Sequence, residues 1–134
     1  MPARDGETAA LLKKSGTVTL SATGQGVLQF DPDNANQRWE VTGVVVATDQ
    51  AATATTVPVA TLALNTNSLS GMSQGNQRGT TWSGNNDSFT GLVDVGPADF
   101  LSVLFSPPPG NPGTALSGVH ASAVLTGTKY TRRT

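Results

Sequence analysis

Apolar and polar residues alternate with a period of two along much of the chain from Gly16 onward. In residues 16–21, Val18 and Leu20 alternate with threonine and serine, as in a β-strand that has one face in solvent. Segments of this kind recur, and runs rich in Gly, Pro, Asn and Ser separate them. The pattern predicts about eight strands: 16–21, 25–30, 38–48, 57–65, 80–82, 89–95, 100–106 and 114–128.

The longest apolar run, residues 38–48, has apolar side chains on both of its predicted faces. A strand that is covered on both sides usually lies in the middle of a sheet. We therefore expect a central strand here. Strict alternation assigns Trp39, Val41, Val45 and Ala47 to one face and Val44 and Val46 to the other.

These strands define an all-β fold class. Because no helical segment lies between them, they indicate an antiparallel two-sheet sandwich or a barrel and argue against a parallel α/β sheet. We favour the sandwich, and the jelly roll is one form of it. The order of the strands in the sheets does not follow from the sequence.

Both ends of the chain differ from this pattern. The segment Thr8 to Lys14 is the only stretch with helix-forming composition, but it is shorter than the roughly 12 residues that an isolated helix needs. We therefore predict an N-terminal arm (1–15), a β-sandwich domain (16–128) and a basic C-terminal tail (129–134). Deleting the first 14 residues is expected to leave the body folded. The length, 134 residues, suits a single domain.

The charges are few and unevenly distributed. Charged residues make up 13% of the sequence and the formal net charge is -1, but the body between Gly16 and Gly127 has seven acidic and two basic residues. An acidic body is unsuited to nucleic acid, so we expect no nucleic-acid partner. The basic tail supplies candidate assembly contacts, and a solvated tail is the alternative. These candidates are Lys129, Arg132 and Arg133.

The sequence has no cysteine, which excludes disulfides, thiolate metal sites and a thiol nucleophile. No run approaches the roughly 20 apolar residues of a membrane span, and residues 1–15 lack the apolar segment of a secretory signal. We therefore expect no membrane partner and synthesis in a cytoplasm.

A hydrolase motif occurs in an unsuitable context. Ser73 lies in a G-x-S-x-G pattern, and acidic residues followed by His120 complete the order of a Ser-Asp-His triad. The motif requires a serine on a strand-to-helix turn, whereas Ser73 lies in a polar loop with no predicted helix after it. We predict no catalytic residues and no enzyme activity. The acidic candidates are Asp87, Asp94 and Asp99.

Other ligand sites are weakly supported by the sequence. His120 is the only histidine and cannot form a histidine-based metal site alone. Asp31, Asp33 and Asn34 resemble the start of a calcium loop, but the following residues depart from that pattern, so a turn explains them. We expect no metal and no cofactor. Trp82, in a polar region, is the candidate exposed aromatic for stacking on a sugar.

Several strand segments resemble a known family: GTVTLSATGQGVLQF, RWEVTGVVVATD, PVATLALN and GTALSGVHASAVLTGTKY. They resemble the small β-sandwich virion proteins of tailed phages that infect actinobacteria, of the head-decoration or minor-tail type. The resemblance covers most of the chain from Gly16 onward and rests on strand texture and turn placement. It implies a structural role in the virion, with the major capsid or tail proteins of the same particle as partners and a homo-oligomer on its surface. The alternative is a minor tail or carbohydrate-binding module that contacts a host surface glycan.

Overall fold

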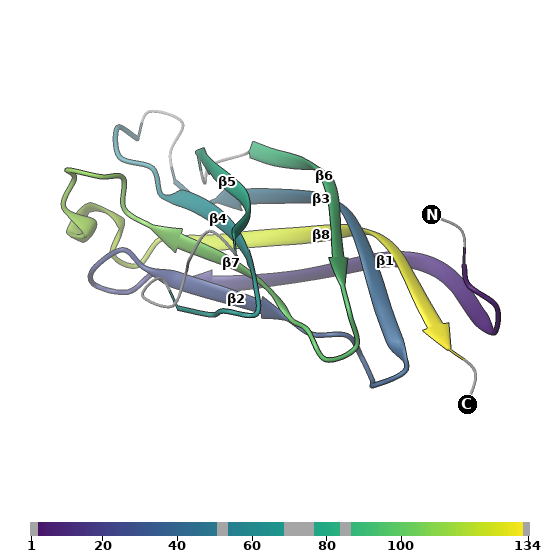
Figure 1. Cartoon of the computed structure of the whole chain (residues 1–134). Coiled ribbons are helices and arrows are strands. Elements are labelled where there is room, and N and C mark those ends of the chain that lie inside the picture. Colours follow the sequence, from purple (N-terminus) through teal and green to yellow (C-terminus); the bar gives the residue numbers. More distant parts are fainter. Residues whose placement is uncertain (1–2, 51–53, 69–76, 84–86, 133–134) are drawn as a thin grey trace.

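A computed structural model describes residues 3–50, 54–68, 77–83 and 87–132, with the backbone alone for residues 79–83 and 87. Within these residues, eight strands and one short 3-10 helix make up the regular structure, and the two termini lie at the same end of an elongated molecule (Figure 1). The elements are β1 (Glu7–Thr19), β2 (Gly26–Phe30), β3 (Gln37–Thr48), β4 (Val59–Leu64), β5 (Gln77–Ser83), β6 (Asp87–Val95), β7 (Leu101–Ser106), η2 (Gly113–Leu116) and β8 (His120–Arg132).

The strands form two four-stranded antiparallel sheets, which confirms the predicted sandwich. The first sheet has the order β1-β8-β3-β6 and the second β2-β7-β4-β5. Four of the pairs, β1 with β8, β2 with β7, β3 with β6 and β4 with β5, are those of a single long hairpin that is folded back on itself. Winding this hairpin into two sheets gives a jelly roll.

Apolar side chains from the two sheets fill the space between them. The largest fully buried ones include Leu12, Trp39, Leu62, Phe105 and Leu125, each with at most 1% of its surface exposed. Burial of a side chain of this size contributes roughly 1.5–3 kcal/mol. The hydrophobic effect therefore holds the sheets together without disulfides.

Strand β3 is central, as predicted, but the assignment of its apolar residues to two faces was wrong. Trp39 and Val41 face the core, and so do Val44 and Val46, while Val45 is 49% exposed. The register with both neighbouring strands shifts between Val41 and Gly43. This β-bulge inserts one residue into the alternation and moves every later side chain to the opposite face.

The chain ends also differ from the prediction. Thr8 to Lys14, predicted as part of an arm, lie in β1, which begins at Glu7 and pairs with β8 over 13 positions, from Glu7 opposite Arg132 to Thr19 opposite His120. The limits predicted for the body, residues 16 and 128, fall inside these two strands. Since β1 also buries Leu12 in the core, deleting residues 1–14 would remove core packing, contrary to our expectation from the sequence.

The last predicted strand begins later than the sequence suggested. Within 114–128, the first residues belong to η2, and β8 starts at His120. Pro112 precedes η2. Leu116 of η2 is fully buried, so this turn covers one end of the core between the sheets. None of the helices formed by the described residues is long and apolar enough to cross a membrane.

Candidate interaction site

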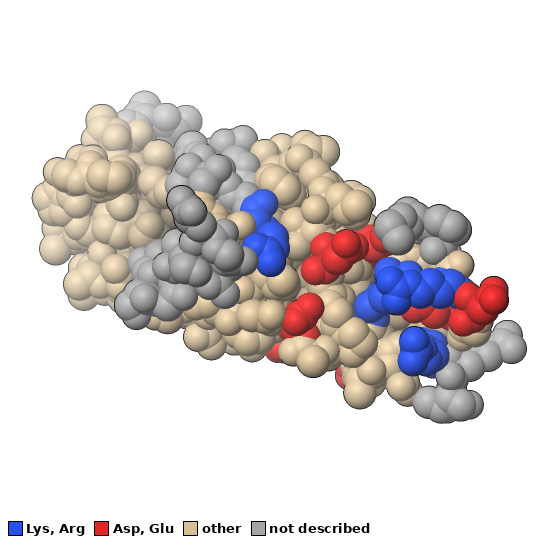
Figure 2. Space-filling view, viewed as in Figure 1, with Lys and Arg blue, Asp and Glu red and all other residues tan. Residues whose placement is uncertain are grey.

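Charged side chains gather toward the end of the sandwich where the termini lie. Figure 2 shows arginine, lysine and carboxylate groups there, whereas the opposite end presents only uncharged atoms on this face. That opposite end contains η2 and the loop that precedes it, whose residues 106–119 include no charged side chain. On this face, the charged side chains are therefore concentrated toward the terminal end.

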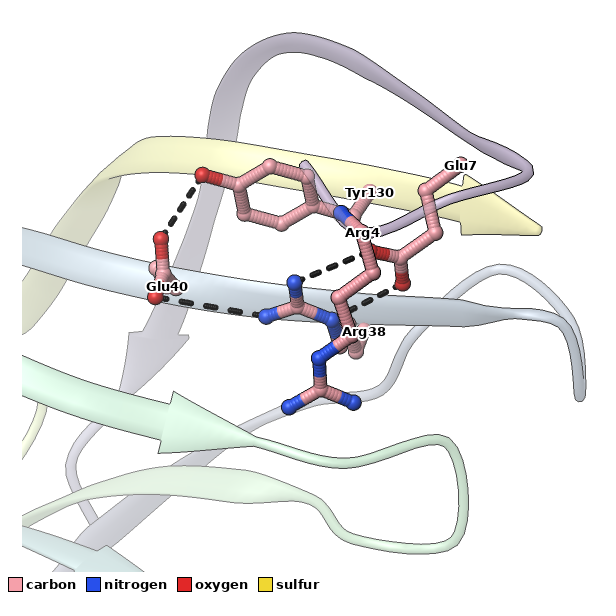
Figure 3. Close-up of polar contacts among 5 residues, drawn as sticks. All are labelled: Arg4, Glu7, Arg38, Glu40 and Tyr130. Carbon is pink, nitrogen blue, oxygen red and sulfur yellow. Dashed lines mark hydrogen bonds and ion pairs between the residues drawn. The ribbon is translucent and has the colours of Figure 1, made fainter. Parts of the chain in front are cut away.

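Glu7 and Arg38 form a two-pronged ion pair between β1 and β3, across the intervening strand β8 (Figure 3). The Arg38 Nε donates to Glu7 Oε2 at 2.9 Å, and Nη2 donates to Oε1 at 3.0 Å. Only 11% of the Arg38 side chain and 4% of the Glu7 side chain are exposed. Two parallel charged hydrogen bonds fix the direction of the guanidinium as well as its position.

A second buried pair adjoins the first. The Tyr130 hydroxyl donates to Glu40 Oε1 at 2.7 Å, and Arg38 Nη1 lies 3.9 Å from Glu40 Oε2. The Arg38 guanidinium also lies 4.1 Å from the centre of the Tyr130 ring, which is a favourable cation-π distance. Arg38 thus links both carboxylates and the aromatic ring (Figure 3).

These contacts shift the pKa values in the directions that the charges require. The hydrogen bonds from Arg38 lower the pKa of Glu7 from 4.5 to about 2, against the opposing effect of burial. The hydrogen bond from Tyr130 is the main cause of a lowered pKa at Glu40, and the same bond raises the pKa of Tyr130. Both carboxylates are therefore ionised at neutral pH, and the cluster is held together by charge.

Beside this cluster, a hollow of about 130 Å³ opens on the surface, here called the arginine hollow. The side chains of Arg4 and Arg132 form no ion pair with any other described residue. Three arginines and one glutamate line the hollow, so its lining has a net positive charge. Its lining residues are Arg4, Glu7, Ala35, Asn36, Arg38, Pro97 and Arg132.

The size and charge of the hollow decide what it can bind. Ligand pockets usually enclose about 300–1,000 Å³, so the arginine hollow has room for little more than one small anionic group. Guanidinium groups match the two oxygens of a carboxylate or phosphate. The hollow therefore suits a single acidic side chain or chain terminus of a partner.

A second hollow of about 300 Å³ shares Arg4, Arg38 and Pro97 with the first. Asp94 and Asp99 also line it, so its charges balance. Asp99 is held in place, because its Oδ2 accepts from the Gly96 backbone N–H at 2.9 Å and its Oδ1 accepts from the Asn65 side chain at 2.9 Å. We see no preference for an anion here.

At the opposite end of β8, His120 has a carboxylate partner, Asp49. The distance from His120 Nδ1 to Asp49 Oδ2 is 2.6 Å, and the His120 backbone N–H donates to Asp49 Oδ1 at 2.9 Å. Both side chains are more than half exposed. The hydrogen bonds from His120 lower the pKa of Asp49, and the pair fastens the end of β3 to the start of β8.

Two of the acidic candidates of the hydrolase motif, Asp94 and Asp99, lie apart from His120. Ser73 lies outside the described residues, as does the side chain of Asp87. Asp94 and Asp99 line the hollow at the terminal end, whereas His120 pairs with Asp49, which was not among the acidic candidates. Among the described residues, no group of three His, Asp or Glu side chains could hold a metal ion.

The predicted calcium-loop residues form a turn. The Asn34 side chain accepts a hydrogen bond from the Asn36 backbone N–H at 2.9 Å, and the Asp33 backbone N–H donates to Gln37 Oε1 at 3.1 Å. Asp33 also accepts from Lys14 at 2.6 Å, and this bond lowers its pKa. A lysine thus occupies the position that a cation would take near this carboxylate.

The basic residues of the predicted tail lie in different environments. Lys129 is half-buried and opposite Trp39, and it contributes to the lowered pKa of Asp33. Arg132 is exposed and lines the arginine hollow. Arg133 lies outside the described residues. Trp82 lies in β5 opposite Ala60, on the edge of its sheet, and its side chain is not described.

The sequence analysis missed Arg4, Glu7, Arg38, Glu40 and Tyr130 as a cluster. One signal was available: Arg38 and Glu40 are two residues apart, and so are Tyr130 and Arg132, so each pair shares a face of its strand. Extending the last strand to residue 132 would have brought both pairs into view. Placing Glu7 beside them requires the register of β1, which the sequence does not provide.

Comparisons with known proteins give weak likenesses to solved viral structures. No family model matches the sequence, and no curated protein matches it significantly. The chain is similar to the VP2 subviral particle of infectious bursal disease virus, with a TM-score of 0.37 and 10% identity over 97% of this chain and 38% of that one. The structure of T=1 particles derived from that virus gives a TM-score of 0.38 and 11% identity over 94% of this chain and 39% of that one.

The Gx strain of the same virus gives a TM-score of 0.35 and 13% identity over 95% of this chain and 40% of that one. The structural neighbours are thus viral particle proteins, and this chain spans about two fifths of their length. At TM-scores below 0.5, these likenesses assign neither a family nor a function.

Proposed function

We propose that this chain is a non-enzymatic structural protein of a tailed-phage virion, attached to the outside of the head as a decoration or cement protein. The observation that carries the proposal is the jelly roll with a filled interior. Jelly rolls are common in viral capsid domains as well as in lectins, so the fold supports this role by analogy. The sequence resemblance to phage virion proteins points in the same direction.

The surface supports a binding role more than a catalytic one. The arginine hollow is too small for most substrates, but it suits an acidic group on a neighbouring protein. Arg4 and Arg132 are exposed, and the side chain of neither forms an ion pair with a described carboxylate. In this proposal, the major capsid protein supplies a glutamate, an aspartate or a terminal carboxylate to the hollow.

The second candidate is a minor tail or carbohydrate-binding module. The position of Trp82 in the edge strand β5 favours it, because an aromatic residue at the edge of a sheet can present its ring to a sugar. Saturable binding to a glycan array, lost in Trp82→Ala and retained in Trp39→Phe, would establish this function. Trp39 is the matched control because it lies in the core.

The head-decoration proposal is tested by sedimentation of purified particles in a density gradient. The protein should migrate with the particles in many copies per head and should rebind to particles that have been stripped of it. Migration at the top of the gradient, together with failure to rebind, would contradict the proposal. Rebinding to isolated tails alone would instead support the minor-tail candidate.

A further inference from the structure

Strand β1 forms an edge of the first sheet and leaves part of its backbone without a partner strand. It lies at the end of the order β1-β8-β3-β6, and it is 13 residues long. An edge of this length is a template for another strand unless it is covered, bulged or heavily charged. The residues 8–11 of this edge, Thr-Ala-Ala-Leu, carry no charge.

The second half of β1 packs against β2 of the other sheet. A side chain at Gly16 would contact Leu28 and Phe30 of β2, and one at Gly26 would contact Val18 and Leu20. Residues 8–13 precede this overlap. There, every side chain except that of Leu12 is exposed, and Leu11 has 81% of its surface exposed, the largest fraction among the exposed large hydrophobic residues.

Among the described residues, the turn that precedes β1 meets this edge only at Glu7, the first residue of the strand. After the turn in which the Glu7 backbone N–H donates to the Arg4 carbonyl at 3.0 Å, Arg4 lies beside Arg38 of β3 (Figure 3). Within the described residues, β1 has no strand partner other than β8.

We propose that residues 7–13 of β1 pair, antiparallel and about a two-fold axis, with the same residues of a second copy of this chain. The β1-β8-β3-β6 sheets of the two copies then join into one continuous eight-stranded sheet. Strand addition of this kind gains main-chain hydrogen bonds and covers the apolar side chains on the joined face. This pairing goes beyond the proposed function, because two copies of the chain can form it whether or not they are attached to a particle.

The sequence selects the register of this pairing. Two residues that lie directly opposite one another in the joined sheet must point to the same face. Because the faces alternate along each copy of β1, the numbers of two such residues must add up to an even number. The two-fold axis therefore passes beside one residue, which lies opposite the same residue of the second copy. An axis at Ala10 places Leu11 opposite Ala9 of the second copy. It also places Lys13 opposite Glu7 at each end of the paired segment, so that residues of opposite charge face one another.

The neighbouring registers are less favourable. An axis at Ala9 sets Leu11 against the charged Glu7, and an axis at Leu11 sets Lys13 against Ala9 with no opposite charge. Only the axis at Ala10 combines an apolar centre with opposite charges at both ends. This pattern, Glu-x-Ala-x-Leu-x-Lys, is complementary to itself when it is reversed.

The contact is weak for two molecules in solution. Seven paired residues span about 24 Å, and the area that they cover is below the roughly 1,000 Å² of a stable interface. We therefore expect a dissociation constant between about 10 µM and 1 mM. On a surface that holds many copies, a high effective concentration makes such a contact effective.

The register can be tested by single cysteines in the full chain, which has no cysteine of its own. Directly opposite Cα atoms in an antiparallel pair are about 4.5–5.5 Å apart, within disulfide range. Ala10→Cys should therefore form a covalent dimer under mild oxidation at least about tenfold faster than Ala9→Cys or Leu11→Cys. All three positions are exposed, so each variant serves as a control for the reactivity of the others.

Sedimentation equilibrium of the wild type provides the second measurement. The average mass should rise with concentration, and Lys13→Glu should weaken the association by about tenfold, since it sets like charges opposite one another twice. Thr17→Glu is the control, because it adds a negative charge on the same strand beyond the paired residues. A mass that stays monomeric, or faster crosslinking at residue 9 or 11, would overturn the proposal. Particle attachment is not measured here, so its loss or retention cannot be confused with this result.

Discussion

Leu11 and Leu12 are neighbours in β1, yet 81% of the surface of Leu11 is exposed and only 1% of that of Leu12. The pleat of the strand turns the first side chain to solvent and the second into the core between the sheets. One strand thus serves both as a wall of the sandwich and as a surface for other molecules. The N-terminal segment is therefore an integral part of the fold.

The first prediction follows from this pair. Leu12→Ala should lower the free energy of unfolding by about 2–5 kcal/mol, because it removes buried methyl groups and leaves a cavity. Leu11→Ala should change it by less than about 0.5 kcal/mol. Urea unfolding at concentrations low enough to keep the chain monomeric measures both. Equal effects of the two substitutions would contradict the placement of β1 in the first sheet.

The second prediction concerns acid stability. Because Arg38 lowers the pKa of Glu7 from 4.5 to about 2, the ion pair contributes its full stability above about pH 4.5 and loses it as the pH falls toward 2. In Glu7→Gln, this part of the acid dependence should disappear. Thermal unfolding of both proteins between pH 2 and 7 measures the difference, which should be largest at neutral pH and vanish near pH 2.

Asp5→Asn supplies the control for this experiment, since Asp5 is an exposed acidic residue in the same turn. Asp5 forms no ion pair with a described residue, so its substitution should leave the stability at neutral pH unchanged. A Glu7→Gln protein whose stability depends on pH as strongly as that of the wild type would show that the bond to Arg38 contributes nothing.

The third prediction concerns the close contact between β8 and β3. A side chain at Gly127 would overlap the backbone carbonyl oxygen of Glu40, beside the bulge of β3. Gly127→Ala should therefore force the two central strands apart and lower the free energy of unfolding by at least about 3 kcal/mol.

Gly110→Ala is the matched control. Gly110 has a φ of +81° but nothing within 4 Å of an added side chain, so its substitution should cost only about 1–2 kcal/mol of backbone strain. Chemical unfolding measures both values. A smaller loss for Gly127→Ala than for Gly110→Ala would contradict the register of β3 and β8.

The fourth prediction concerns the arginine hollow. Arg4→Gln and Arg132→Gln should each weaken attachment to particles by about tenfold, because a guanidinium that binds a carboxylate contributes roughly 1.5–3 kcal/mol. Raising the salt concentration should weaken attachment of the wild type more than that of either variant. Binding to stripped particles at several salt concentrations provides the measurement.

Arg78→Gln is the control here, because it removes an exposed arginine that does not line the hollow. It should bind as the wild type does. If all three substitutions weaken binding equally, general attraction to a negative surface explains the effect, and the hollow has no specific role.

The sequence predicted the local structure well and the long-range contacts poorly. Alternation identified eight strands because each depends on neighbouring residues, such as Val18 and Leu20. The alternation did not reveal the bulge at Thr42 and Gly43, because an inserted residue does not change the strand propensity of the sequence. It nevertheless turns Val45 outward and Val44 inward. The alternation of apolar and polar residues therefore predicts which face a side chain occupies only up to the next β-bulge.

The candidate site depended on contacts that no local pattern contains. Glu7 and Arg38 lie 31 positions apart, and Asp49 and His120 lie 71 apart. The first pair needs β1 and β3 on either side of β8, and the second needs β8 beside β3, and both placements come from the long hairpin of the jelly roll. Arg132 was a candidate on account of its charge, but its place beside Arg4 required the observed register.

The central claim, a structural role on the phage head, is tested most directly by immunogold electron microscopy. Antibodies against the folded protein are applied to intact particles from the culture that produces it. The account predicts regular labelling over the heads and none on particles that lack the protein. Labelling confined to tails, or absent from every particle, would contradict it.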